Sequence, residues 1–143
     1  MKRTKNPAKE AEYRKRATDL VAQMTLHEKV SQMLSWAPAI ERLGIPAYNW
    51  WSEGIHGIGR AGTATVFPQA IGMAAAFDED MMEQVGNAVG VEARGKYNMC
   101  RAHGDRDIFK GLTVWAPNIN IFRDPRWGRG HETFGEGSFL TGR

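Results

Sequence analysis

Helical and extended segments alternate along this chain of 143 residues, and this alternation constrains its fold more than any other feature. Residues 8–24 place apolar side chains near helical spacing, whereas residues 45–50 are short and extended. Such alternation is typical of α/β proteins built around a parallel sheet. The sequence therefore predicts an α/β fold rather than an all-α or all-β fold.

Two positions carry the signals that start a helix. Thr25, with Glu28 three residues later, forms a capping box in which each side chain binds the backbone of the other residue. Asp78, followed by two more acidic residues, offers an N-cap and negative charge to the first turn of a later helix. The helix that starts after Thr25 is expected to carry the apolar residues Val30, Met33 and Leu34. The helix that starts after Asp78 is expected to place Met82, Val85, Val89 and Ala93 on one face.

Three segments are predicted as strands, namely residues 45–50, 70–77 and 112–117. The alanines of residues 70–77 also favour helix, but an apolar run without alternation suits a parallel strand covered on both faces. A closed (β/α)8 barrel takes about 250 residues. We therefore expect an incomplete barrel: the N-terminal portion of a TIM-like fold, with about three strands and flanking helices.

The charge of the chain is concentrated at its start. Residues 1–16 hold seven Lys or Arg against two Glu, a local charge of +5 in a chain of net charge +3. A basic segment can bind nucleic acid, but only Tyr13 interleaves an aromatic ring with these charges. We interpret residues 1–16 as a basic tail that begins a solvated helix, and we predict no nucleic-acid partner.

The remaining composition predicts a protein without cofactor, metal or membrane. Cys100 is the single cysteine, so an internal disulfide is excluded, and the histidines (His27, His56, His103 and His131) lack the spacing of a helical zinc site. No apolar run reaches the ~18 residues of a membrane helix, and the first thirty residues lack the apolar stretch of a signal peptide. A cytoplasmic location is the resulting prediction.

Residues 49–57 form a glycine-bracketed segment that carries Trp50, Trp51, Glu53 and His56. Sugar hydroxyls need charged hydrogen-bond partners, and the C–H faces of sugars pack on aromatic rings. This combination therefore suits a carbohydrate pocket. The alternative is that both indoles belong to the core and that Glu53 is a surface charge.

A second polar segment, residues 117–133, carries arginines at three-residue intervals. These are Arg123, Arg126 and Arg129, with Asp124 and Glu132 nearby. The planar guanidinium can hold vicinal hydroxyls or lock a loop against carboxylates. For each arginine, a structural ion pair and a ligand contact both remain open, and we interpret Arg123 as the structural partner of a nearby acid.

Taken together and in order, these segments resemble glycoside hydrolase family 3. The resemblance covers roughly residues 20–143 and lies in WWSEGIHG, TVFPQAIGMAAAFD, EARGKYN and HGDRDIFKGLTVWAPNINIFRDPRWGRGHETFGE. The WSE…HG and RDPRWGRG forms are most similar to the β-xylosidase branch, whereas many β-glucosidases of the family have Asp in place of Glu53. The whole chain, residues 1–143, is thus expected to be part of the family's N-terminal barrel domain.

The resemblance implies a retaining, exo-acting β-glycosidase with a barrel followed by an α/β sandwich domain. Its Asp nucleophile and its Glu acid/base would both come after Arg143, so we expect no catalytic residue in this chain and no activity from it alone. Glu53 and Arg129 match positions that bind the hydroxyls of the terminal sugar in subsite −1. Trp51 and His56 are further candidates for lining that pocket.

The expected ligand is a terminal β-linked glycoside or oligosaccharide, a β-xyloside before a β-glucoside. The sequence departs from the family pattern at Gly137-Ser138, where Asp-Pro is usual, so the entry into the next helix is uncertain. Two alternatives remain open. One is a free-standing, non-catalytic sugar-binding module, and the other is a nucleic-acid binder that uses the basic tail.

Overall fold

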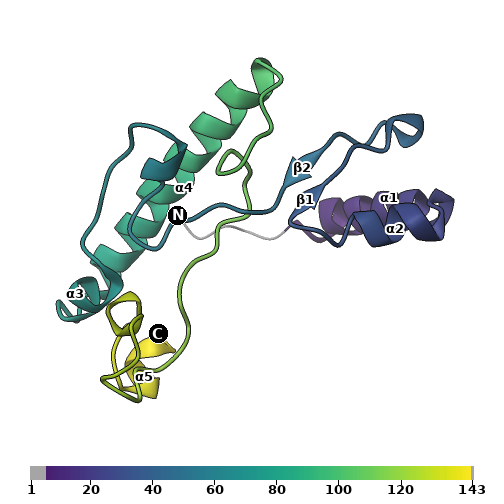
Figure 1. Cartoon of the computed structure of the whole chain (residues 1–143). Coiled ribbons are helices and arrows are strands. Elements are labelled where there is room, and N and C mark those ends of the chain that lie inside the picture. The colour runs from purple at the N-terminus through teal and green to yellow at the C-terminus, as the bar shows by residue number, and fades with distance from the viewer. Residues whose placement is uncertain (1–5, 143) are drawn as a thin grey trace. The chain divides into compact units, whose positions relative to one another are not determined.

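The computed structural model describes residues 6–142. The chain divides into two compact units, of which the first ends at Tyr48 and the second begins at Asn49. The elements of both units are labelled in Figure 1.

Helix α1, Pro7–Gln23, opens the first unit and confirms the helix predicted for residues 8–24. It begins at Asn6, whose side chain accepts from the backbone N–H of Lys9, and a proline occupies the first turn, where its missing N–H does no harm. The basic residues from position 9 onward lie on this solvated helix. Lys2, Arg3 and Lys5 of the predicted basic tail lie outside the described residues.

Helix α2, Leu26–Ser31, begins with the predicted capping box, and both of its hydrogen bonds are present. Arg42 binds the same carboxylate, and this guanidinium, together with the backbone N–H of Thr25, lowers the pKa of Glu28 to about 2. The helix is shorter than predicted, because it ends before Met33. That side chain and its apolar neighbour at position 34 therefore do not extend an apolar face of the helix.

The first unit closes with β1, Trp36–Ala37, a 3-10 turn η1, Glu41–Leu43, and β2, Tyr48–Asn49. The two strands form the one sheet in the part of the chain that the structure describes. Two backbone hydrogen bonds between Ile40 and Ile45 hold the reversal between them, and Gly44 takes the left-handed conformation that the turn requires. Ala37 and Ile40 are the buried apolar residues of this unit.

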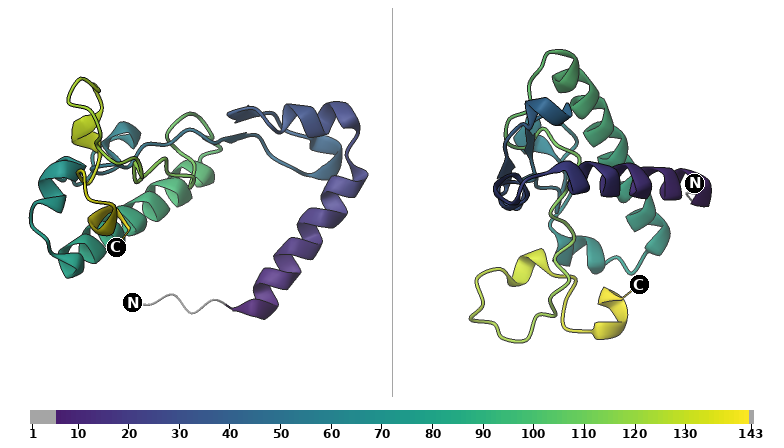
Figure 2. Two further views of the ribbon diagram at one scale, coloured as in Figure 1. Left: turned by 90° about the horizontal axis from the view of Figure 1, so that it is seen from below. Right: turned by 90° about the vertical axis from the view of Figure 1, so that its right-hand side faces the viewer.

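The second unit is organised along α4, Glu79–Ala102, the long helix visible in both views of Figure 2. Asp78 caps it as predicted, by accepting from the backbone N–H of Met81. The apolar face predicted for this helix is half-buried along its length, which confirms that part of the pattern. The other elements of the unit are η2, Gly59–Ala61, α3, Ala70–Ala74, η3, Gly130–Glu132, and α5, Ser138–Thr141.

The prediction of a strand over residues 70–77 is wrong, because residues 70–74 form α3. Alanine has the highest helix propensity and lacks the branched side chains that strands favour, so local preference and structure agree here. The predicted cover on both faces is also only partial, because Ala70, Met73 and Ala74 are buried whereas Ile71 and Phe77 are exposed. The helix-start signal at Asp78 therefore marks the boundary between two helices rather than between a strand and a helix.

The third predicted strand, residues 112–117, is extended but forms no ladder among the described residues. A hydrogen bond of 2.8 Å, from the N–H of Trp115 to the carbonyl oxygen of Ser52, ties its backbone to the segment after β2. A side chain at Gly54 would collide with Val114, so the glycine permits this close approach. The α/β content predicted from sequence is present, whereas the three-stranded barrel portion is not formed as regular strands.

Helix α5 follows Gly137, which caps the helix without a side-chain hydrogen bond. This is the position where the sequence departs from the family pattern. The helix is a single turn, Ser138–Thr141, and the right-hand view of Figure 2 shows it at the end of the chain. Within residues 6–142, we find no helix with the length and apolar character that crossing a membrane demands.

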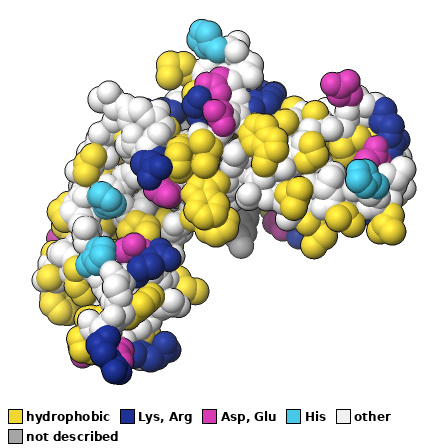
Figure 3. Space-filling view, viewed as in Figure 1, with side chains coloured by type: hydrophobic (Ala, Val, Ile, Leu, Met, Phe, Trp, Pro, Cys, Tyr) yellow, Lys and Arg dark blue, Asp and Glu magenta, His cyan; other side chains and the backbone are white. Residues whose placement is uncertain are grey.

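We expect the 143-residue chain to be poorly stable alone. Its buried core is small, and α1 and α4 bury no residue, whereas large apolar side chains reach the surface in the space-filling view (Figure 3). The free energy gained by burying this small apolar area offsets only a little of the conformational entropy that the chain loses on folding. The exposed apolar surface also favours association between copies of the chain. Thermal denaturation followed by circular dichroism, together with size-exclusion chromatography, should show a broad transition and associated species. A sharp, cooperative transition of a strict monomer would contradict this expectation and favour an independent sugar-binding module.

Candidate functional site

A pocket of about 540 Å³ lies in the second unit, and all four residues predicted to bind sugar line it. They come from two segments, the loop after β2 and the loop that contains η3. The full lining consists of Trp51, Glu53, Gly54, Ile55, His56, Gly57, Gly59, Arg60, Val66, Gln69, Trp115, Arg129, His131 and Glu132. The two polar segments singled out in the sequence therefore meet at one site.

Two stacked indoles form one wall of the pocket. The rings of Trp51 and Trp115 lie 4.8 Å apart between centroids, with 26° between their planes. The indole N–H of Trp115 donates to the carbonyl oxygen of Trp50 at 2.7 Å, which fixes the orientation of that ring. Trp50 and Trp51 are 45% and 40% exposed, so the alternative that both belong to the core is wrong. Exposed, oriented rings of this kind can pack against the C–H face of a sugar.

Glu53 lies on the same loop and is paired with Arg60. The Nη1 atom of Arg60 donates to Oε2 of Glu53 at 3.4 Å, and the guanidinium lies 4.4 Å from the ring centroid of Phe109. The aromatic face supports the cation by a cation–π contact. The carboxylate thus has one cationic neighbour and keeps oxygens available to accept from ligand hydroxyls.

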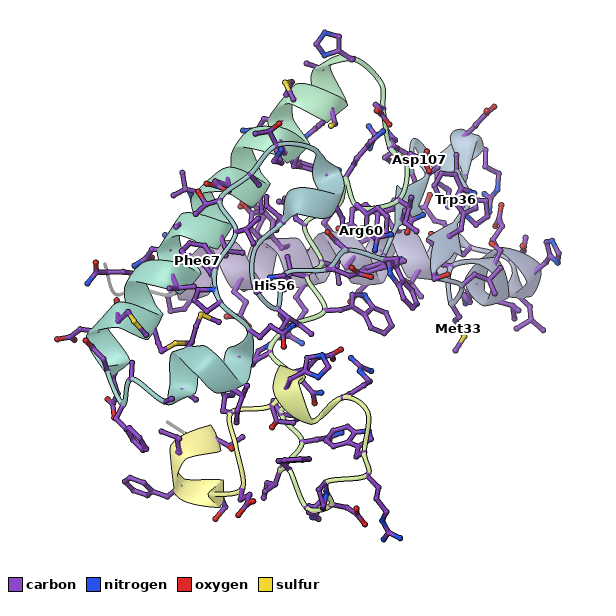
Figure 4. All side chains as sticks on the ribbon, turned by 60° about the vertical axis from the view of Figure 1, so that its left-hand side comes forward. Met33, Trp36, His56, Arg60, Phe67 and Asp107 are labelled. Carbon is purple, nitrogen blue, oxygen red and sulfur yellow. The ribbon has the colours of Figure 1, made fainter. Side chains whose placement is uncertain are left out.

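His56 marks the other end of this loop, and its surroundings are mostly backbone. Its Nδ1 atom lies 3.2 Å from the carbonyl oxygen of Phe67, whose N–H donates to the carbonyl oxygen of His56 at 2.8 Å. Gly57 between them has a φ of +118°, and a side chain there would collide with the carbonyl oxygen of Thr65. Figure 4 shows His56, Arg60 and Phe67 on the segment that runs beside α4. The close approach of residues 56–57 to 65–67 therefore depends on the glycine.

Helix α4 holds this segment from behind through Glu92 and Lys96, which lie one turn apart. Glu92 accepts from the backbone N–H and the hydroxyl of Thr65, and these bonds lower the pKa of its carboxyl group. Lys96 donates to the carbonyl oxygens of Ala61 and Thr63. The EARGKYN motif thus positions the loop that carries Arg60 and His56, although neither Glu92 nor Lys96 lines the pocket.

Arg129 and Glu132 form an ion pair that also lines the pocket. Nε of Arg129 donates to Oε2 of Glu132 at 2.7 Å, and Nη2 donates to the same oxygen. The pair lowers the pKa of Glu132 and raises that of Arg129. Glu132 is therefore an anion that accepts hydrogen bonds, and it is not suited to donate a proton to a leaving group.

The other two arginines of the loop differ from each other. Asp124 pairs with Arg126, whose Nε and Nη2 donate to the two carboxylate oxygens at 3.0 and 2.6 Å. Arg123 is exposed and forms no ion pair with any residue between 6 and 142, so its interpretation as a structural partner of an acid is wrong. The regular spacing of the three arginines in the sequence did not distinguish their roles. The local turns of the folded loop do.

Sequence reasoning did not assign Arg60, Trp115 or Gln69 to the site, and it left Glu132 undecided. Arg60 had a usable signal, because it follows Glu53 on the same glycine-rich loop. Trp115 had none, since its stacking partner is 64 positions away and only the folded chain brings them together. A group of three or more His, Cys, Asp or Glu with metal-binding geometry is not found among the described residues.

The stacked indoles and the two ion pairs that line the pocket are groups that can contact a polyhydroxylated ligand. Comparison with known proteins identifies the family. The family model "Glycosyl hydrolase family 3 N terminal domain" matches residues 16–143, and the chain belongs to this family.

The chain is similar to several β-xylosidases. It is 51% identical over 138 residues to "Probable beta-D-xylosidase 7" of Arabidopsis thaliana, covering 90% of this chain and 17% of that protein. It is 47% identical over 130 residues to "Xylan 1,4-beta-xylosidase" of Xylanibacter ruminicola, covering 90% of this chain and 15% of that protein. The chain thus spans about a sixth of the length of these relatives.

A solved structure is also similar. A GH3 exo-β-xylosidase, in complex with a xylobiose aziridine activity-based probe, matches with a TM-score of 0.74 and 38% identity. The match covers 89% of this chain and 16% of that chain. The chain therefore also spans about a sixth of the length of that solved chain.

Proposed function

We propose that this chain contributes the terminal-sugar pocket of a retaining, exo-acting β-glycosidase that removes β-xylosyl units. The observation that carries the proposal is the convergence of Glu53 and Arg129 with the Trp51–Trp115 stack on one pocket. Family membership and the similarity to β-xylosidases support the same reaction class. The pocket would take a terminal β-xyloside, and a β-glucoside is the next candidate substrate.

Each wall of the pocket has a distinct role in this proposal. The carboxylate of Glu53 accepts hydrogen bonds from sugar hydroxyls, and Arg129 donates to them. The indoles cover the apolar face of the ring, and His56 closes the end of the loop beside Phe67. Charge-assisted hydrogen bonds of this kind contribute about 1.5–3 kcal/mol each when buried.

An exchange of segments tests the proposal. The chain replaces the matching segment of the Xylanibacter ruminicola β-xylosidase, and the product is called the chimeric enzyme below. We expect hydrolysis of nitrophenyl β-xyloside above that of nitrophenyl β-glucoside. The unmodified enzyme is the control for activity, and a melt reports folding. A chimeric enzyme that melts like its parent but turns over neither substrate would contradict the proposal.

The 143-residue chain by itself should not hydrolyse either substrate. A retaining glycosidase needs a nucleophile and a protonated acid about 5–5.5 Å apart, and the acid needs a raised pKa. Of the two carboxylates in the pocket, Glu53 is paired with Arg60, and the pKa of Glu132 is lowered by Arg129. The family resemblance implies that both catalytic carboxylates come from later segments. Turnover that persists after repurification would overturn this prediction.

Several expectations from the sequence stay predictions. These are the assignment of residues 1–143 to one partial barrel domain, the α/β sandwich that would follow it, and the cytoplasmic location. We further propose that the long helix and the extended segments of the second unit are parts of the barrel wall, an arrangement that the family similarity supports. The partner of this chain would then be the rest of that barrel.

A further inference from the structure

Glu132 engages one edge of the Arg129 guanidinium and leaves the other edge free. Its Oε2 atom accepts from Nε and Nη2, whereas Nη1 has no hydrogen-bond partner among the described residues. Arginine has a long side chain with several rotatable bonds, so a free guanidinium would occupy many positions. The ion pair selects the positions in which Nη1 is available at the pocket.

The backbone makes this pairing a consequence of local geometry. Arg129 is the N-cap of η3, and Glu132 is its last residue, with its N–H donating to the carbonyl oxygen of Arg129 at 3.0 Å. In a 3-10 helix, side chains three residues apart lie one above the other. The turn therefore places the carboxylate directly beside the guanidinium.

The turn is itself fixed from behind. Gly130 is buried against the ring of Phe122, where a side chain would collide with three ring atoms. Thr133 is fully buried, and its hydroxyl donates to the carbonyl oxygen of Gly130 at 2.7 Å and accepts from the N–H of Gly135. Helix α3 lies against η3 on the same side. A rigid turn with its charged side chains on the pocket is thus a platform for Arg129.

We propose that Glu132 is a positioning residue that orients Arg129 toward the sugar hydroxyls and does not itself bind the substrate. The proposal rests on the proposed function, since it concerns the grip on the same terminal sugar. The pair of Asp124 and Arg126 in the same segment is a useful contrast, because both side chains are largely solvent-exposed. That pair does not line the pocket.

The test is a double-mutant cycle in the chimeric enzyme with nitrophenyl β-xyloside. We expect Glu132→Gln to lower kcat/KM by about fivefold or more, mainly through a higher KM, because a bound substrate loses the oriented donor in both ground and transition states. In an Arg129→Ala background, the same substitution should change kcat/KM by less than about twofold, because its effect acts through the missing arginine. Glu132→Asp, which keeps the charge, should restore part of the loss.

Asp124→Asn is the matched control, and it should leave both kinetic constants near those of the unsubstituted enzyme. The cycle holds even if Glu132→Gln lowers the melting temperature, because structural damage would raise KM in both backgrounds. Equal effects of Glu132→Gln with and without Arg129 would overturn the positioning role. An unsubstituted chimeric enzyme without activity would instead count against the proposed function, so the two failures are distinguishable.

Discussion

Glu53→Ala and Arg129→Ala should each lower kcat/KM of the chimeric enzyme by at least about tenfold. Each removes a charged hydrogen-bond partner of the sugar, and a loss of 1.36 kcal/mol of transition-state stabilisation already corresponds to about tenfold. The structure adds a second cost for each substitution, because each residue has its own ion-pair partner, which would lose its counter-charge. Loss of Glu53 leaves Arg60 without its carboxylate, and loss of Arg129 leaves Glu132 without its cation.

The arginines of the same loop supply the controls for this experiment. Arg123 is exposed without an ion pair among the described residues, and Arg126 pairs with Asp124 away from the pocket. Alanine at either position should change stability by no more than about 0.5 kcal/mol, since exposed ion pairs contribute little. Steady-state kinetics beside thermal melts separates the effects. If Arg123→Ala impaired catalysis without lowering the melt, while Arg129→Ala did neither, the assignment within the loop would be wrong.

Gly57→Ala should have a comparably large effect through the backbone. The residue has a φ of +118°, which residues other than glycine rarely adopt. An added Cβ would also collide with the carbonyl oxygen of Thr65. Strained backbone and overpacking each cost about 1–3 kcal/mol. The segment that carries Arg60 and His56 must therefore move, and we expect a lowered melting temperature together with loss of most xylosidase activity in the chimeric enzyme.

Gly59→Ala is the matched control for this substitution. It lies two residues away in the same loop, and its nearest neighbour would be Cγ2 of Val66 at 3.9 Å, an ordinary contact distance. Gly59 also lines the pocket, but its backbone does not need the glycine conformation, so we expect a small change in melting temperature and a far smaller loss of activity than for Gly57→Ala. Similar behaviour of the two alanine variants would refute the claim that the backbone of Gly57 holds the pocket.

Local signals in the sequence were sufficient to predict the helix starts. The capping box at Thr25 and the N-cap at Asp78 depend on residues within three positions of each other, so no tertiary contact is needed to recognise them. The same holds for the two chemical segments, where Glu53 and Arg129 stand in dense, polar, aromatic surroundings. The order of these segments along the chain then carried the resemblance to a family.

Local signals failed where a longer-range interaction decides the conformation. An apolar run such as residues 70–77 is compatible with a helix or a buried strand, and the choice depends on what covers it. Residues 112–117 are extended, yet a strand also requires a hydrogen-bonded neighbour, which the described residues do not supply along its length.

The sequence by itself determined which residue types could bind a sugar, because charge, planarity and hydrogen-bonding capacity belong to each side chain. Only the tertiary structure brought these residues together. It stacked Trp115 on Trp51, and it placed the Glu53–Arg60 and Arg129–Glu132 pairs on one pocket. Pairing energies fall steeply with distance. Distances between segments far apart in the chain are set by packing, as at Gly130, and by hydrogen bonds such as those that Glu92 accepts from Thr65.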